Sequence, residues 1–139
     1  KSIEKKTGKT INHIFNKIGE DFFREEERKV LKTKLSGNSF VMAVGGGTPC
    51  FFNNMELMNQ SGLTIYLKLT HEKIFERLKN KTKNRPLVNR LNNDDLMEYI
   101  RVNLARREKW YLQSALIIED DEQDSEILFK KIQACQIRN

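Results

Sequence analysis

The sequence predicts an α/β fold in which helices cover a parallel sheet in three layers. Apolar runs at residues 39–44, 63–69 and 116–119 are expected to be strands, and helical patterns separate them. Strands that alternate with helices are typical of a parallel sheet with helices on both faces. The first run is nearly continuously apolar, as in a strand buried on both faces. It leads directly into a triple glycine at residues 45–47.

The helices follow from apolar spacing and from capping residues. Gly8 is expected to end the first helix, while Thr10 and Thr70 are suited to begin later ones. At 139 residues, the chain is expected to form one domain, residues 1–139, around one core. Helices are predicted at residues 3–6, 10–18, 20–35, 55–58, 70–78, 94–111 and 125–137.

Composition narrows the class of function. Apolar residues make up 38% of the chain, and no apolar run approaches the roughly 20 residues that span a bilayer. The two cysteines, Cys50 and Cys135, lack metal-ligand spacing, so we expect a cytoplasmic protein without a metal site of its own. The net charge of +6 favours an anionic partner, either a phosphorylated small molecule or a nucleic acid.

The triple glycine, Gly45, Gly46 and Gly47, is the most informative local motif. Glycines at the carboxyl end of a buried strand let the backbone come close to a ligand, and ligands bind at that end of a parallel sheet. A flexible turn is the alternative interpretation. The motif is not a phosphate-binding P-loop, because no Gly-Lys-Ser/Thr follows it.

Two arginines have the surroundings of carboxylate-binding residues. Arg24 follows two phenylalanines and lies three residues before Glu27, which helical spacing turns at least partly inward. Arg107 lies on the apolar stripe of its helix, whereas Arg106 is rotated roughly 100° away. An inward guanidinium must be paired or bind a ligand. A surface ion pair for Arg24, and an Arg107 side chain that reaches past the stripe to solvent, are the alternatives.

A basic loop at about residues 80–93 contains Arg85 and Pro86 and has little apolar content. A loop of this length and charge is suited to close over a nucleotide as a lid and to bring an arginine to the transferred phosphate. A plain solvated loop is the alternative.

In their order along the chain, these segments resemble the shikimate kinase family. The matching pieces are IEKKTGKTINHIF (3–15), FFREEE (22–27), VGGGTP (44–49), IYLKL (65–69), NRPLV (84–88) and ARREKWY (105–111). The resemblance implies a P-loop fold like that of nucleoside-monophosphate kinases, with ATP and Mg²⁺ as cosubstrates. The implied reaction transfers the γ-phosphoryl group of ATP to the 3-hydroxyl of shikimate, in aromatic amino-acid (chorismate) biosynthesis.

The resemblance also implies roles for individual residues. Arg24 and Arg107 correspond to the arginines that hold the shikimate carboxylate, and Glu27 supports the first of them. Gly45 to Gly47, chiefly Gly46, correspond to the backbone that meets the substrate ring and hydroxyls. Arg85 corresponds to the catalytic lid arginine directed at ATP. Phe15 and Phe23 correspond to aromatic walls of the pocket. Shikimate and ATP are then the partners, without nucleic acid or membrane, and a monomer is expected.

Two alternatives stay open at this point. One is another kinase of the same fold that acts on a carboxylated or sugar-acid acceptor, and the other is a basic nucleic-acid-binding module. The family's P-loop, with its lysine, its magnesium-contacting hydroxyl and the acidic motif after it, has no match in residues 1–139. We therefore expect a strand–P-loop–helix–strand unit, with the general base, to be missing from the front of this chain.

A first prediction follows from that comparison. Purified residues 1–139 are expected to phosphorylate shikimate feebly or not at all, because the ATP-binding motif and the base have no counterpart in them. A coupled assay of ADP release checks this. Robust ATP-dependent turnover by residues 1–139 would contradict it.

Overall fold

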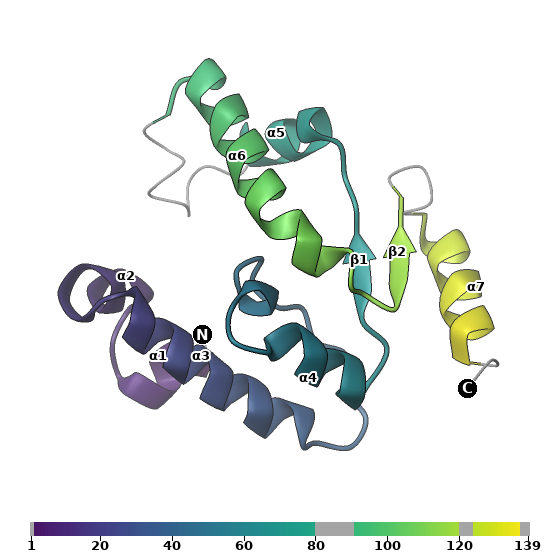
Figure 1. Cartoon of the computed structure of the whole chain (residues 1–139), viewed down its shortest axis with the longest axis horizontal. Helices are drawn as coiled ribbons and strands as arrows, with labels where there is room; N and C mark the ends of the chain where they lie inside the picture. Colours follow the sequence, from purple (N-terminus) through teal and green to yellow (C-terminus); the bar gives the residue numbers. More distant parts are fainter. Residues whose placement is uncertain (1, 80–90, 120–123, 137–139) are drawn as a thin grey trace. The chain divides into compact units, whose positions relative to one another are not determined.

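The computed structural model describes residues 2–79, 91–119 and 124–136. The chain divides into two compact units, Lys1–Leu63 and Thr64–Asn139, which are described separately. Unit 1 contains α1 (Ser2–Thr7), α2 (Ile11–His13), a π-helical turn η1 (Ile14–Ile18), α3 (Glu20–Leu35), a 3₁₀ turn η2 (Thr48–Cys50) and α4 (Asn54–Ser61) (Figure 1). Unit 2 contains β1 (Ile65–Leu67), α5 (His71–Lys79), α6 (Asn93–Tyr111), β2 (Leu116–Ile118) and α7 (Ser125–Gln136).

In unit 1, the predicted cap Thr10 begins α2, and Gly19 precedes α3. The hydroxyl of Thr10 accepts a hydrogen bond from the backbone N–H of His13 at 3.2 Å, as an N-cap does. The following turn ends where the N–H of Gly19 donates to the carbonyl of Ile14 at 2.9 Å. Gly19 has a φ of 114°, which a residue with a Cβ rarely adopts, so the chain can turn sharply there into α3.

A small core and one ion cluster hold α1 and η1 against α3. Ile3, Ile14 and Phe23 are buried together. Lys29 and Lys6 donate to the buried Glu26 carboxylate at 2.7 and 2.8 Å, and these bonds lower the pKa of Glu26. Because that pKa is lowered, the stabilisation is present at neutral pH and is lost as pH falls through it.

In unit 2, β1 and β2 pair in parallel, with Ile65 opposite Leu116 and Leu67 opposite Ile118. The chain between them forms α5 and α6 (Figure 1). A strand–helix–strand connection of this kind is the unit of a parallel α/β sheet. Leu96 and Ile100 of α6 are buried in the cluster that packs α6 against α5. The predicted strands at 63–69 and 116–119 are therefore confirmed, with shorter bounds.

The predicted strand at residues 39–44 is wrong. This segment forms no strand in the structure, Val41 is fully exposed, and Phe40 and Val44 are also exposed. The prediction rested on a continuous apolar run, but a buried strand also needs backbone partners on its edges and elements on its faces. Among the described residues, no strand pairs with this segment.

The predicted helices are present, with ends that differ by a few residues from those expected. Within the described parts of the chain, no helix is long and apolar enough to cross a membrane. Cys50 and Cys135 are not joined in a disulfide.

A second prediction concerns the core of unit 1. Ile14 is completely buried, so Ile14→Ala is expected to lower the free energy of unfolding by about 2–5 kcal/mol, and Ile14→Val by about 1 kcal/mol. Urea unfolding followed by circular dichroism measures both. The exposed neighbour Lys17 is the control, and Lys17→Ala should change the value by less than about 0.5 kcal/mol. Equal losses in the Ile14→Ala and Lys17→Ala variants would contradict the core assignment.

Candidate functional site

Arg24 is the centre of the site in unit 1. Its side chain, on α3, is only 11% exposed, so its charge must be paired. Nη1 donates to Oε2 of Glu27 at 2.8 Å. Nε and Nη2 donate to Oε1 of Glu20 at 3.1 and 2.9 Å. The Glu27 side chain is 13% exposed, which confirms the predicted inward orientation and the pairing with Arg24.

Aromatic rings surround the guanidinium. Its Cζ lies 4.1 Å from the centroid of Phe51 and 5.1 Å from that of Phe23, within the range of a cation–π contact. Phe15 packs against Phe23, with ring centroids 4.7 Å apart. Phe23 is buried, whereas Phe15 keeps 38% of its surface exposed. The two phenylalanines predicted as pocket walls are therefore neighbours, and Phe15 is the one open to solvent.

The triple glycine comes into contact with this arginine. A Cβ placed on Gly47 would lie 2.8 Å from both Nη1 and Nη2 of Arg24, which is closer than real Cβ contacts. At Gly45, a Cβ would lie 3.4 Å from the hydroxyl of Thr48, an ordinary contact. Gly46 is exposed. Of the three predicted glycines, Gly47 is therefore the one whose lack of a side chain the contact with Arg24 requires.

The loop after the glycines is attached to the same carboxylate. The hydroxyl of Thr48 donates to Oε1 of Glu27 at 2.8 Å, so the two oxygens of Glu27 bind Thr48 and Arg24 respectively. The Nδ2 of Asn54 donates to the backbone carbonyl of Thr48 at 2.9 Å. Both Thr48 and Asn54 are buried.

Two N–H groups of Arg24 have no hydrogen-bond partner among the described residues. A guanidinium has five N–H groups, and Glu20 and Glu27 together take three of them. The other two belong one to Nη1 and one to Nη2. A guanidinium with one N–H left on each Nη atom has donors of the kind that bind a carboxylate or phosphate.

Arg107 belongs to unit 2 and is half-buried on α6, whereas Arg106 is exposed. The predicted difference between the two neighbours is confirmed. Among the described residues, none forms an ion pair with Arg107.

On the same helix, Tyr111 packs against Tyr66 of β1, with ring centroids 5.1 Å apart. Burial, with Glu108 adding to it, raises the pKa of Tyr66 to about 12, so Tyr66 stays protonated and is no general base at neutral pH.

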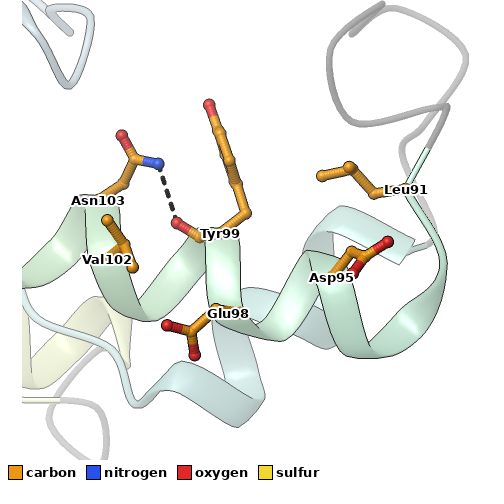
Figure 2. Close-up of a pocket in the computed structure, with 6 residues that line it drawn as sticks. All are labelled: Leu91, Asp95, Glu98, Tyr99, Val102 and Asn103. Carbon is orange, nitrogen blue, oxygen red and sulfur yellow. Dashed lines mark hydrogen bonds between the residues drawn. The ribbon is translucent and has the colours of Figure 1, made fainter.

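A shallow groove of about 390 Å³ opens on α6, lined by Leu91, Asp95, Glu98, Tyr99, Val102 and Asn103 (Figure 2). In Figure 2, the amide of Asn103 donates to the backbone carbonyl of Tyr99, at 2.9 Å. The charged groups of the groove are two carboxylates, which repel an anionic substrate. No residue predicted to bind substrate or nucleotide lines the groove, so we do not regard it as the functional site.

Two sequence predictions concern ligands that the described residues do not test. Arg85 and most of the predicted lid at 80–93 lie outside the described residues. Within residues 2–79, 91–119 and 124–136, no group of three His, Cys, Asp or Glu side chains is placed to hold a metal ion.

Sequence reasoning missed four residues of the site. Glu20 could have been found, because it lies four residues before Arg24 on the same helix. Phe51 reaches Arg24, and Thr48 reaches Glu27, through the path of a loop that no periodicity predicts. Asn54 contributes through its bond to the carbonyl of Thr48.

The fold and the site define the class of protein first. An α/β chain that holds an arginine fork beside a glycine turn is suited to bind a small carboxylated or phosphorylated molecule. Comparison with known proteins then identifies the family. The family model for shikimate kinase matches residues 1–136. The chain belongs to the shikimate kinase family, and it is therefore a kinase, which confirms the resemblance and decides against a nucleic-acid-binding module.

Known shikimate kinases are similar in sequence over most of this chain. The shikimate kinase of Phocaeicola vulgatus is 38% identical over 120 residues, which cover 86% of this chain and 69% of the relative. The shikimate kinase of Azobacteroides pseudotrichonymphae is 41% identical over 116 residues, which cover 83% of this chain and 68% of the relative.

Solved structures give the same result. The crystal structure of shikimate kinase from Bacteroides thetaiotaomicron has a TM-score of 0.84 at 34% identity and covers 97% of this chain and 77% of that chain. The structure of shikimate kinase from Acinetobacter baumannii in complex with shikimate has a TM-score of 0.80 at 34% identity. The match covers 99% of this chain and 75% of that chain. These matches confirm the predicted P-loop, nucleoside-monophosphate-kinase-like α/β class.

A third prediction tests the contact between Gly47 and Arg24. Gly47→Ala is expected to weaken shikimate binding at least about tenfold, because the new Cβ must displace the guanidinium or the loop. Titration calorimetry with shikimate measures this. Gly62 is the control, since a Cβ there meets nothing within 4 Å. Equal affinity in the Gly47→Ala and Gly62→Ala variants would show that the contact is unimportant.

Proposed function

We propose that this protein transfers the γ-phosphoryl group of ATP to the 3-hydroxyl of shikimate, and that Arg24 binds the shikimate carboxylate. The observation that supports this most directly is the Arg24 guanidinium, which has one N–H on each Nη atom without a hydrogen-bond partner among the described residues. The family assignment supports the reaction. A relative of similar structure has been solved in complex with shikimate.

The other residues of the proposed site have supporting roles. Gly45 to Gly47 present backbone groups to the substrate ring and hydroxyls, with no side chain in the way. Phe15, the more exposed ring of the tilted pair with Phe23, offers an apolar surface to the substrate ring. Arg107 supplies a second guanidinium to the same carboxylate, an assignment that rests on its half-buried position and on the family motif.

ATP and Mg²⁺ enter the proposal through the family. Magnesium usually keeps several waters and binds through substrate phosphates with one or two carboxylates, so we assign it no ligand among the described residues. Arg85 is proposed to contact the ATP phosphates, by its place in the NRPLV motif. A cytoplasmic monomer is proposed, because ATP is available in the cytoplasm and the reaction as proposed needs no second copy.

The activity is tested with the full-length gene product, ATP, Mg²⁺ and a panel of hydroxy-acid acceptors. We expect the highest kcat/KM with shikimate, much lower values with gluconate, and a large loss with shikimate methyl ester, which lacks the charged carboxylate. Phosphorus NMR of the product identifies the phosphorylated hydroxyl. Preference for a sugar acid over shikimate would favour the other kinase of this fold.

A fourth prediction uses the two adjacent arginines of α6. Arg107→Lys is expected to raise the KM for shikimate about 10–100-fold, because lysine retains the charge but loses the planar fork. The KM for ATP should change little. Arg106→Lys is the matched control, since its side chain is exposed, and should behave as the wild type. Similar kinetics for the two variants would remove Arg107 from the proposed site.

A further inference from the structure

Glu27 is held in place from two directions. One oxygen accepts from Arg24 at 2.8 Å and the other from the hydroxyl of Thr48 at 2.8 Å. Glu20, the other carboxylate on Arg24, is 51% exposed, whereas Glu27 is 13% exposed. The orientation of the guanidinium is therefore set chiefly from the Glu27 side, where solvent cannot replace the protein's hydrogen bonds.

The position of Thr48 is itself fixed by buried groups. Its backbone N–H donates to the carbonyl of Gly45 at 2.9 Å. Its own carbonyl accepts from Nδ2 of Asn54, whose side chain is completely inaccessible. Since a carbonyl needs a donor, the amide of Asn54 can take only this orientation. The hydroxyl of Thr48 thus connects a fixed turn to Glu27.

We propose that Thr48 is a positioning residue for substrate binding: its hydroxyl holds Glu27, and Glu27 in turn directs the Arg24 fork at the carboxylate of shikimate. Asn54 supports this arrangement by fixing the backbone of Thr48. The inference rests on the proposed function, because it assumes that Arg24 binds the substrate carboxylate. In this proposal, Thr48 acts only through Glu27, to which its hydroxyl donates.

The expected consequence is a selective loss of acceptor affinity. Without the Thr48 hydroxyl, Oε1 of Glu27 loses a charge-assisted hydrogen bond, and the carboxylate is free to rotate and draw Arg24 with it. A fork displaced from its bidentate geometry binds the carboxylate less well, whereas ATP binding does not depend on it. The effect should therefore be on the KM for shikimate.

A fifth prediction tests this with near-isosteric variants in the full-length enzyme. Thr48→Val keeps the shape but removes the hydroxyl, and we expect it to raise the KM and Kd for shikimate about tenfold, with kcat and the KM for ATP within about twofold of the wild type. Thr48→Ser retains the hydroxyl and should restore most of the affinity. Thr33→Val, at an exposed threonine of α3 whose hydroxyl donates only to the helix backbone, is the matched control.

A double-mutant cycle separates positioning from general destabilisation. In a Glu27→Gln background, Thr48→Val should weaken shikimate binding by much less than tenfold, because the group that Thr48 holds has already changed. Full additivity of the two changes would overturn the inference. So would a Thr48→Val enzyme that melts at a lower temperature but keeps its KM for shikimate.

The two proposals fail in different ways. If the wild-type protein neither binds nor phosphorylates shikimate, the proposed function is wrong, and the inference falls with it. If the wild type is active, and Thr48→Val has the same shikimate affinity as Thr33→Val, only the role of Thr48 is wrong.

Discussion

The pairing of one nearly buried guanidinium with Glu27 is the interaction on which the rest of the site depends. A charge that is only 11% exposed is costly unless ionised partners and hydrogen bonds compensate for lost water. Glu27 provides the ionised partner for Arg24 and also accepts a hydrogen bond from the hydroxyl of Thr48. One carboxylate therefore joins α3 to the glycine turn, and the contact that stabilises unit 1 also orients the group proposed to bind substrate.

That pairing requires the glycine turn to approach closely. The backbone at Gly47 lies so near Arg24 that a Cβ would come within 2.8 Å of both Nη atoms. Phe51, just after the turn, places its ring 4.1 Å from the same guanidinium. Close approach excludes water from the flanks of Arg24, and a charge-assisted hydrogen bond is stronger where water is excluded. Glycine is needed here for space, since its φ of −81° is available to any residue.

The sequence predicts those parts of this arrangement that depend on spacing along one element. Helical periodicity turns Glu27 inward and separates Arg107 from Arg106, and the structure agrees. Sequence patterns fail to predict a structure that depends on a partner far away along the chain. Residues 39–44 have the composition of a buried strand, yet Val41 is fully exposed because composition does not supply a neighbouring strand. The reach of Thr48 to a residue 21 positions earlier was unpredictable for the same reason.

The electrostatics of Arg24 explain why one arginine is insufficient for the proposed substrate. Glu20 and Glu27 both pair with Arg24, so the group as a whole bears a net negative charge. A carboxylate approaching the free fork gains two directed hydrogen bonds but is repelled by two like charges, one of them well shielded from solvent. Directed bonds provide selectivity for a planar anion, whereas affinity needs another cation. In the proposed function, the family motif assigns this part to Arg107. A lysine at that position would supply the charge without the fork.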